Sequence, residues 1–304
     1  MKIGRFVFWI VLSGLIFVVA AGCQPGFQPE SYTDDAGRMV NIAESPQRII
    51  SHVPSITEII FAIGLEERVV GVSEYCDYPE EAKRTEKVGS FSKPSVEKIV
   101  DLEPDLVLTN GGDEQLMAQF DSLGITYLVI DPEDIDSILR DIELLGKVTG
   151  VEKQAGELVA DMRGRMSRVA DKVKGAPSVR VFYTFAVTDL NNPWTAGPGS
   201  FIDSLIAMSG AENIAAVVQS PYAKLSIEEI VSSDPEVIIL GIRHGYLPET
   251  TVEQLREHPV WRQITAVKHG RVYTVDGDLL NRPGPRIVQG LEEIARFIHP
   301  ELFE

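Results

Sequence analysis

The stretch VEKQAGELVADMRGRMSRVADKVK, residues 151–174, decides the fold. It contains no proline, and its apolar residues recur every three or four positions, which predicts one continuous amphipathic helix. Thr149-Gly150 precedes it and Gly175-Ala176-Pro177 follows it, as is typical of helix ends. A helix of this length spans roughly 35 Å. Its apolar stripe consists of Val151, Ala155, Leu158, Val159, Met162, Met166, Val169 and Val173.

The segments on both sides of this helix alternate between short apolar runs and amphipathic stretches. This order is typical of parallel sheets covered by helices. We therefore expect an α/β protein with two lobes of mostly parallel sheet, joined by a single long rigid backbone helix, with a ligand cleft between them. The expected organisation is a signal peptide (1–22), a tether with an N-terminal hairpin (23–44), an N-terminal lobe (45–146), the connecting helix (147–176) and a C-terminal lobe (177–304).

The two halves share an internal repeat. Residues 91–108, FSKPSVEKIVDLEPDLVL, align without a gap with residues 222–239, YAKLSIEEIVSSDPEVII, at a constant offset of 131. Each copy predicts an aromatic residue, a loop, a capped helix, a proline and a buried strand. We interpret the lobes as related by a pseudo-two-fold axis, with Phe91 facing Tyr222. The identical pairs are Lys93/Lys224, Ser95/Ser226, Glu97/Glu228, Ile99/Ile230, Val100/Val231 and Pro104/Pro235.

The residues around the first predicted strand of the N-terminal lobe carry two further expectations. Ser55-Ile56-Thr57-Glu58 has the pattern of a capping box and is expected to open a helix that runs through Ile63. His52 lies just before it, near the expected cleft. Its imidazole could bind cobalt or iron, although a lone histidine is more often an ordinary loop residue.

The first 22 residues resemble a bacterial lipoprotein signal. Lys2 and Arg5 precede an apolar run from Phe6 to Val19, and small residues then lead to Cys23. This run is short for a helix that spans a bilayer. The resemblance implies cleavage before Cys23 and lipidation of that cysteine. The mature protein is then expected outside the cytoplasm, in the periplasm or at the cell surface, and anchored to the membrane by its acyl chains.

Charge and cysteine content exclude several classes of function. The formal net charge is −17, and it becomes −19 when Lys2 and Arg5 are removed with the signal. Such an acidic surface argues against nucleic-acid partners and against adhesion to anionic lipid. With Cys23 lipidated, Cys76 is the remaining thiol, so neither an intramolecular disulfide nor a cysteine-based metal cluster can form. No HExxH, GxSxG or P-loop pattern occurs, so the sequence predicts neither an enzyme nor a resident cofactor.

Several segments are similar to the solute-binding proteins of ABC importers, in the class that handles cobalamin, haem and iron-siderophores. The similarity covers nearly the whole mature chain. It implies a monomer that carries a small corrinoid or iron chelate to a permease dimer and its ATPase. The segments that carry the resemblance are RIISHVPSITEIIFAIG (48–64), VGVSEYCDYPEEA (70–82), VGSFSKPSVEKIVDLEPDLVL (88–108), PWTAGPGSFIDSLIAMSGAENI (193–214) and NRPGPRIVQGLEEI (281–294).

Within this family the chain most resembles the cobalamin binders, in which aromatic side chains from both lobes grip the corrin. Wide aromatic platforms and a few polar contacts suit a rigid planar ring system with an amide-bearing rim. Phe91 and Tyr222 stand where family members can carry tryptophan, so the stacking area is smaller. By position, the resemblance implies ligand contacts from Tyr75, Phe91, Trp194, Tyr222, Asp278 and Arg282.

Other ligands and roles remain open at this point. An iron-siderophore is often anionic and favours several cleft arginines, of which Arg282 is the main candidate. Haem requires an axial tyrosine or histidine, which Tyr75 or His52 could provide. A sensor lipoprotein would bind its ligand without transport. In the resembling family, paired glutamates dock onto arginines of both permease subunits, and by position this role is expected of Glu97 and Glu228. Both are expected near N3 of their helices. A favourable interaction with the helix dipole could also account for a glutamate at that position.

Overall fold

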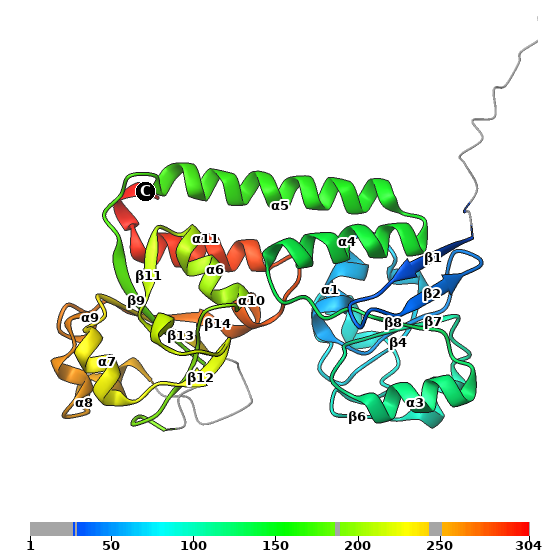
Figure 1. The fold of residues 1–304 in the computed structure, drawn as a ribbon, viewed down its shortest axis with the longest axis horizontal. Helices are drawn as coiled ribbons and strands as arrows, with labels where there is room; N and C mark the ends of the chain where they lie inside the picture. The colour runs from blue at the N-terminus through cyan, green and yellow to red at the C-terminus, as the bar shows by residue number, and fades with distance from the viewer. Residues whose placement is uncertain (1–26, 28, 186–188, 243–250, 304) are drawn as a thin grey trace, which may run out of the picture.

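The computed structural model describes residues 27, 29–185, 189–242 and 251–303. Two lobes lie side by side beneath one long helix (Figure 1). The expected signal peptide and Cys23 lie outside the described residues. Within the described ranges, no helix combines the length and the apolarity needed to cross a bilayer. The chain enters the fold through an antiparallel hairpin of β1 (Glu30–Thr33) and β2 (Met39–Ile42).

The first lobe, called the N lobe, is built around a four-stranded parallel sheet with the strand order β4-β3-β7-β8. Nearly all residues of these strands are buried, which is expected when helices cover both faces of a parallel sheet. The sheet strands are β3 (Ile49–Ser51), β4 (Val69–Val72), β7 (Leu106–Thr109) and β8 (Tyr127–Val129). The other elements are α1 (Pro54–Ala62), the short hairpin of β5 (Gly89–Ser90) and β6 (Lys93–Pro94), α2 (Val96–Asp101) and α3 (Glu114–Leu123).

The second lobe, called the C lobe, has the same architecture, with a parallel sheet in the order β11-β9-β13-β14. The sheet strands are β9 (Val179–Thr184), β11 (Ala211–Asn213), β13 (Val237–Ile242) and β14 (Val272–Asp276). An antiparallel ribbon is formed by β10 (Trp194–Ala196) and β12 (Tyr222–Lys224). The helices are α6 (Phe201–Met208), α7 (Ile227–Ser233), α8 (Val252–Glu257), α9 (Thr265–Lys268), α10 (Gly277–Asn281) and α11 (Ile287–Ile298). The prediction of two α/β lobes with parallel sheets is confirmed.

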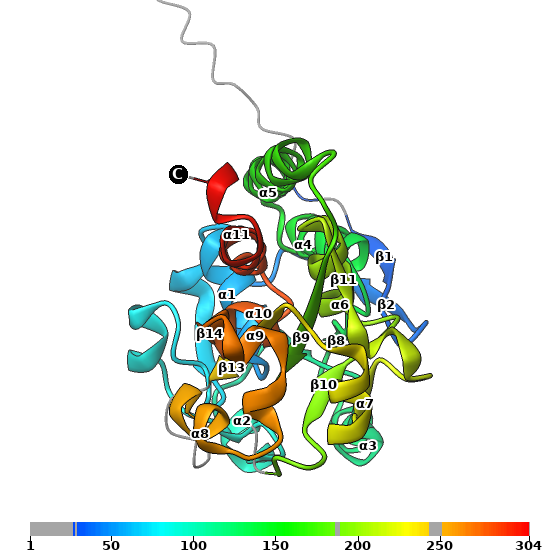
Figure 2. The ribbon, with the colours of Figure 1, turned by 90° about the vertical axis from the view of Figure 1, so that its left-hand side faces the viewer.

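The long helix of the sequence analysis is α5 (Glu152–Val173), roughly 33 Å at 1.5 Å per residue. Its predicted stripe is buried except for the half-buried Leu158, and it belongs to one apolar core that continues into both lobes. A second helix, α4 (Ile135–Thr149), turns back into α5 at Gly150, a residue with φ of 74°. Both α4 and α11 pack against α5 from below (Figure 2). The lobes are therefore braced by packed helices rather than by α5 alone.

The expected capping box at Ser55–Glu58 is wrong. Helix α1 begins two residues earlier, with Val53 as N-cap and Pro54 in the first turn, and the N-cap makes no side-chain hydrogen bond. Proline suits this place because its missing N–H would have no partner there. The Glu58 side chain therefore does not cap the helix, and it forms ion pairs with arginines instead.

The internal repeat corresponds to real structural equivalence at α2 and α7. Ser95 and Ser226 are the N-caps, and each side chain accepts a hydrogen bond from the backbone N–H three residues later. Glu97 and Glu228 are therefore at N2 and not at N3. The capping box of α7 is completed by Glu229, whose pKa is lowered by hydrogen bonds from Ser226. Capping thus does not require Glu228.

A buried carboxyl group on α4 makes stability depend on pH. Asp141 is buried, and its Oδ2 has no hydrogen-bond partner among the described residues. Burial, together with the nearby carboxylate of Asp35, raises the pKa of Asp141 to about 8. Between its unfolded pKa near 3.8 and this value, the folded protein keeps a proton that the unfolded chain releases. Stability should therefore fall as the pH rises through this range.

We expect Asp141→Asn to remove this pH dependence, because the amide cannot ionise. Between pH 5 and pH 8 the wild type should lose up to about 1.4 kcal/mol more per pH unit than the variant. Urea denaturation at each pH unit measures the difference. Equal pH slopes for the two proteins would mean that Asp141 is already ionised in the folded state.

Candidate ligand-binding site

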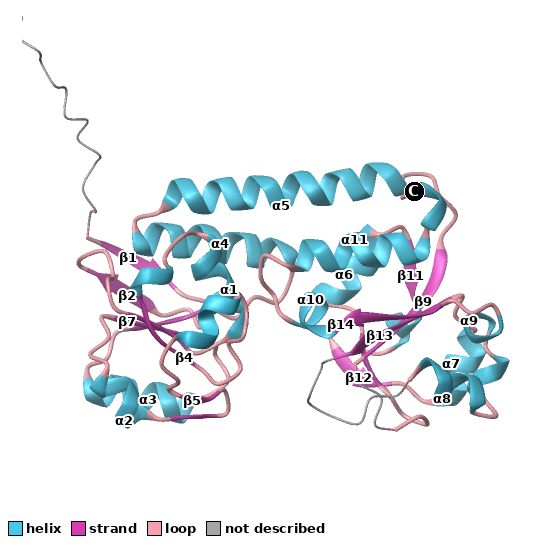
Figure 3. Cartoon of the chain, turned by 180° about the vertical axis from the view of Figure 1, so that it is seen from behind, coloured by secondary structure: helices cyan, strands magenta, loops and turns pink. Residues whose placement is uncertain are grey.

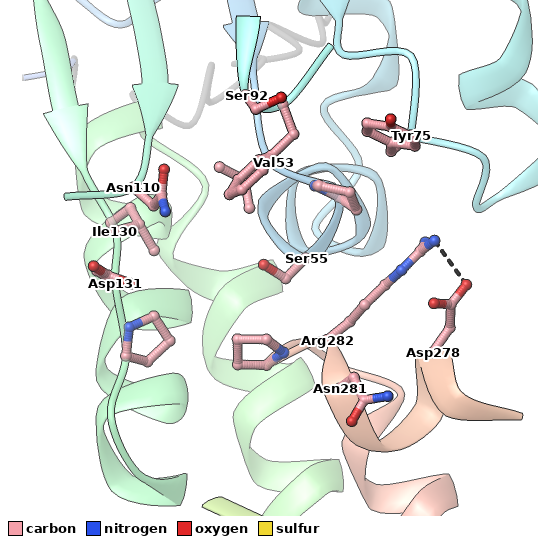
Figure 4. Close-up of a pocket in the computed structure, with 14 residues that line it drawn as sticks. Val53, Ser55, Tyr75, Ser92, Asn110, Ile130, Asp131, Asp278, Asn281 and Arg282 are labelled. Atoms are coloured by element: carbon pink, nitrogen blue, oxygen red, sulfur yellow. Dashed lines mark ion pairs between the residues drawn. The ribbon is translucent and has the colours of Figure 1, made fainter. Parts of the chain in front are cut away.

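A cavity of about 500 Å³ opens between the lobes (Figure 4). On the N-lobe side it is bounded by the start of α1 and by the loops that follow β4, β7 and β8, since parallel strands end at the same edge of a sheet. On the C-lobe side it is bounded by α10 and the residues after it. Its lining residues include four of the six predicted contacts, Tyr75, Phe91, Asp278 and Arg282, together with Asn110, Asp131 and Asn281.

Phe91 presents an aromatic surface at the cavity, 41% exposed, and is supported from behind by His52. The two rings are stacked, with centroids 6.0 Å apart and an interplanar angle of 16°. His52 is buried, and its Nε2 lies 3.2 Å from the carbonyl oxygen of Ser90 while its Nδ1 lies 3.5 Å from Thr109 Oγ1. Burial lowers the pKa of His52, which favours the neutral ring. His52 thus supports the ring of Phe91, and both of its nitrogens have protein partners.

The other two predicted aromatic contacts, Trp194 and Tyr222, do not line this cavity. They lie on the β10–β12 ribbon of the C lobe, where the register pairs Trp194 with Lys224 and Ala196 with Tyr222. Both rings are exposed, Trp194 by 47% and Tyr222 by 42%. A chain of ring contacts runs from Tyr222 through Phe185 to Tyr183, with centroid distances of 5.8 and 5.3 Å.

This chain of rings ends at the cavity wall. The Tyr183 hydroxyl donates a hydrogen bond of 2.8 Å to Oδ1 of Asn281, a cavity residue. Tyr183 is fully buried, and desolvation raises its pKa, so the hydroxyl stays protonated. These contacts connect Tyr222 to the cavity wall, although neither Tyr222 nor Trp194 lines the cavity.

A buried cluster of ion pairs crosses between the lobes at the edge of the cavity. Glu58 of α1, 3% exposed, accepts two hydrogen bonds from Arg286, at 2.8 and 2.6 Å, and one from Arg282 at 3.1 Å. Arg282 also pairs with Asp77 at 2.8 Å and with Asp278 at 2.7 Å. Glu58 and Asp77 belong to the N lobe, and the arginines belong to the C lobe. We call these five residues the inter-lobe cluster.

The inter-lobe cluster fixes the charge state of the cavity wall. Burial lowers the pKa of Arg282, but the hydrogen bond to Asp77 and the charges of Asp278 and Glu58 outweigh it, so the pKa is raised and the guanidinium stays charged. Its positive charge is thus matched by three carboxylates within 3.1 Å. Its Nε, also buried, has no hydrogen-bond partner within the described part of the chain.

The sequence analysis did not predict the role of Glu58 in the inter-lobe cluster. A signal was present, because Glu58 interrupts the apolar run of α1, ITEIIFAI, and a carboxylate inside a buried helix needs a cationic partner. The partner could not be found from sequence, since Arg286 is more than 200 residues away in the chain.

Two parallel-sheet lobes, braced by helices and enclosing a cavity lined from both sides, define a two-lobed solute-binding protein. The family model described as "periplasmic binding protein" matches residues 49–279, and the chain belongs to this family. It acts as a substrate-binding protein of ABC transport in the class that includes binders of vitamin B12, haem and iron-siderophores.

Individual relatives differ in the ligand that their names give. The chain is 34% identical to the ABC transporter substrate-binding lipoprotein YvrC of Bacillus subtilis, over 91% of this chain and 87% of the relative. It is 33% identical to a cobalamin-binding protein of Halobacterium salinarum, over 89% of this chain and 74% of that protein. The structure is also similar to the periplasmic heme-binding protein RhuT of Roseiflexus sp. RS-1, with a TM-score of 0.74 and 26% identity, over 84% of this chain and 99% of RhuT.

Proposed function

We propose that this protein is a lipid-anchored extracytoplasmic binding protein that captures cobalamin or a related corrinoid and delivers it to an ABC importer. The similarity to the cobalamin-binding protein of Halobacterium salinarum supports the ligand class. The name of the lipoprotein YvrC supports anchoring, which would use Cys23 and bring the protein to the outer face of a membrane.

The charge of the cavity wall is the observation that carries the choice of ligand. Among the described lining residues Arg282 is the one cation, and three carboxylates already neutralise it. The other ionisable lining groups include Asp131 and Asp278. A polyanionic ferric siderophore would enter such a wall without compensation, which is costly. A corrinoid with an amide rim can instead exchange hydrogen bonds with the side-chain amides of Asn110 and Asn281, which line the cavity.

Haem is the second candidate, and Tyr75 is the residue that favours it. Tyr75 lines the cavity, and a tyrosine oxygen can serve as an axial ligand of haem iron. The similarity to RhuT points the same way. The two propionates of haem, however, would require cations that the wall does not supply.

Calorimetric titration with cyanocobalamin, haemin and a ferric hydroxamate separates these ligands. We expect cyanocobalamin to bind with a stoichiometry of about one to one. Heat from haemin alone would favour the second candidate, and heat from the ferric hydroxamate alone would leave only the general class. The same titration tests the aromatic contacts.

We expect Phe91→Ala or Tyr222→Ala to weaken cyanocobalamin binding by about 1–3 kcal/mol, the scale of losing one large buried side chain. Phe303→Ala is the matched control, because Phe303 packs under Lys172 near the C-terminus and away from the cavity. An unchanged affinity in Tyr222→Ala would limit the site to the cavity wall and exclude the β10–β12 ribbon.

We further propose that Glu97 and Glu228 dock this protein onto a permease dimer. Both side chains are exposed at equivalent points of α2 and α7. Neither forms a hydrogen bond or ion pair within the described ranges. Two exposed carboxylates related by a pseudo-two-fold axis suit a partner with two-fold symmetry and basic side chains.

A further inference from the structure

Exposed apolar side chains occur at matching positions of the repeat in the two lobes. The large hydrophobic residues that are exposed in the described structure include two pairs related by the offset of 131, Phe91 with Tyr222 and Val100 with Val231. The aromatic pair belongs to the proposed ligand site. The valine pair, 43% and 39% exposed, has no role in ligand binding or in the core.

Most identities within the repeat are explained by folding. Ser95 and Ser226 cap their helices. Ile99 and Ile230 are fully buried in the cores of their lobes. Capping and burial each require a particular kind of residue, so these matches need no function. Solvent-exposed positions carry no such requirement, because surface substitutions usually change stability very little.

One exposed identical pair, Lys93 and Lys224, lies on β6 and β12, and the two others fall on one face of α2 and of α7. Glu97 and Val100 are three residues apart on α2, and Glu228 and Val231 are three residues apart on α7, so each pair is adjacent on the helix surface. Figure 3 shows α2 and α7 in different lobes, both on the side of the molecule away from α5. Each lobe therefore exposes a carboxylate and an apolar side chain three residues later on the same helix.

We propose that Val100 and Val231 are apolar anchors of the same docking surface to which Glu97 and Glu228 belong. The partner is the permease dimer, and each of its subunits should offer a basic side chain beside an apolar recess that receives the valine. Burial of the valine excludes water from the neighbouring ion pair, as the surroundings of an interface hot spot do. This inference rests on the proposed function, and it adds the residues that supply affinity, since exposed ion pairs mainly set orientation and encounter rate.

A second copy of this chain is a poor occupant for the same surface. In a two-fold contact between copies, the same patches meet each other. Glu97 and Glu228 of both copies would then lie together, in a protein whose formal net charge is already −17. Like charges brought into contact oppose association, so the surface suits a basic partner.

The test compares Val100→Asn and Val231→Asn, alone and together, in binding to the permease–ATPase complex in lipid nanodiscs. Asparagine is close to valine in size, and both sites are exposed, so the fold should be kept. We expect each substitution to weaken the complex about tenfold, the scale of one buried valine, with cyanocobalamin affinity unchanged within about twofold. Val217→Asn is the matched control, because Val217 is 63% exposed in the C lobe but lies outside α2 and α7.

Each outcome separates this inference from the proposed function. If the valine variants bind the complex normally while Glu97→Arg with Glu228→Arg does not, the apolar anchors are wrong and the docking role stands. If Val217→Asn weakens the complex as much as the other two, the effect is a general loss of surface apolarity, and the inference is also wrong. If no valine or glutamate variant changes binding, docking uses another face, and both proposals fail.

Discussion

Replacing Glu58 with alanine is expected to lower the free energy of unfolding by about 3–5 kcal/mol, the usual cost of removing one partner from a buried ion pair. Glu58 is the shared acceptor for Arg286 and Arg282, and both arginines are themselves buried. Without the carboxylate, Arg286 loses both of its hydrogen bonds to Glu58 and keeps its desolvated charge. Urea denaturation of Glu58→Ala and of the wild type measures the loss.

The matched control is Glu80→Ala, which removes an exposed ion pair with Lys83. This pair has a similar distance, 2.7 Å, but both side chains are more than half exposed, so its loss should cost much less than the loss of Glu58. Glu58→Gln should fall between the two, because the amide keeps the volume and one acceptor but not the charge. If Glu58→Ala cost no more than Glu80→Ala, the inter-lobe cluster would contribute little to folding.

The double reversal Glu97→Arg with Glu228→Arg is expected to abolish transport in reconstituted vesicles. Each reversal places a positive charge where a basic permease side chain is proposed, so attraction becomes repulsion at both lobes. Each single reversal should reduce transport less, because the other lobe can still engage. Cyanocobalamin affinity should stay within about twofold of the wild type, because neither residue lines the cavity.

Glu157→Arg with Asp171→Arg is the matched control for this experiment. It changes the net charge by the same amount at two exposed positions of α5, on the other side of the molecule. Transport should remain close to that of the wild type in the control. Normal transport by the Glu97 and Glu228 double variant would leave these glutamates with only their favourable position near the helix dipole.

The fold was predictable from sequence because its determinants are local. The stripe of α5 can be read from residue spacing, and the parallel sheets follow from buried runs that alternate with amphipathic segments. The repeat predicted equivalent capped helices, with the N-cap at Pro94 or Ser95 in one copy and at Leu225 or Ser226 in the other, and the structure has Ser95 and Ser226 as N-caps. The helix boundaries were predicted less accurately. Because Glu58 was assigned to a capping box, it was not recognised as a buried charge.

The site was predictable only in part, because its geometry depends on pairings far apart in the chain. Position by position, the resemblance identified Tyr75, Phe91, Asp278 and Arg282, which do line the cavity. It grouped Trp194 and Tyr222 with them, but the β10–β12 ribbon holds these rings outside the lining. His52 was considered as a metal ligand, and only the structure shows that its ring stacks on Phe91 while its two nitrogens lie next to Ser90 and Thr109.

Because α2 and α7 are equivalent, the proposed permease dimer could bind this protein in two orientations. In the proposed complex, the partner has two-fold symmetry. If this protein is rotated by half a turn, Glu97 and Val100 are expected to take the positions of Glu228 and Val231, so the partner would contact nearly the same side chains. Two orientations can thus be productive where an asymmetric surface would allow one, which should raise the association rate roughly twofold. A ligand held between the lobes, close to the pseudo-axis, reaches the same point above the partner in either orientation. Under the proposed docking, delivery would not depend on which lobe contacts which permease subunit.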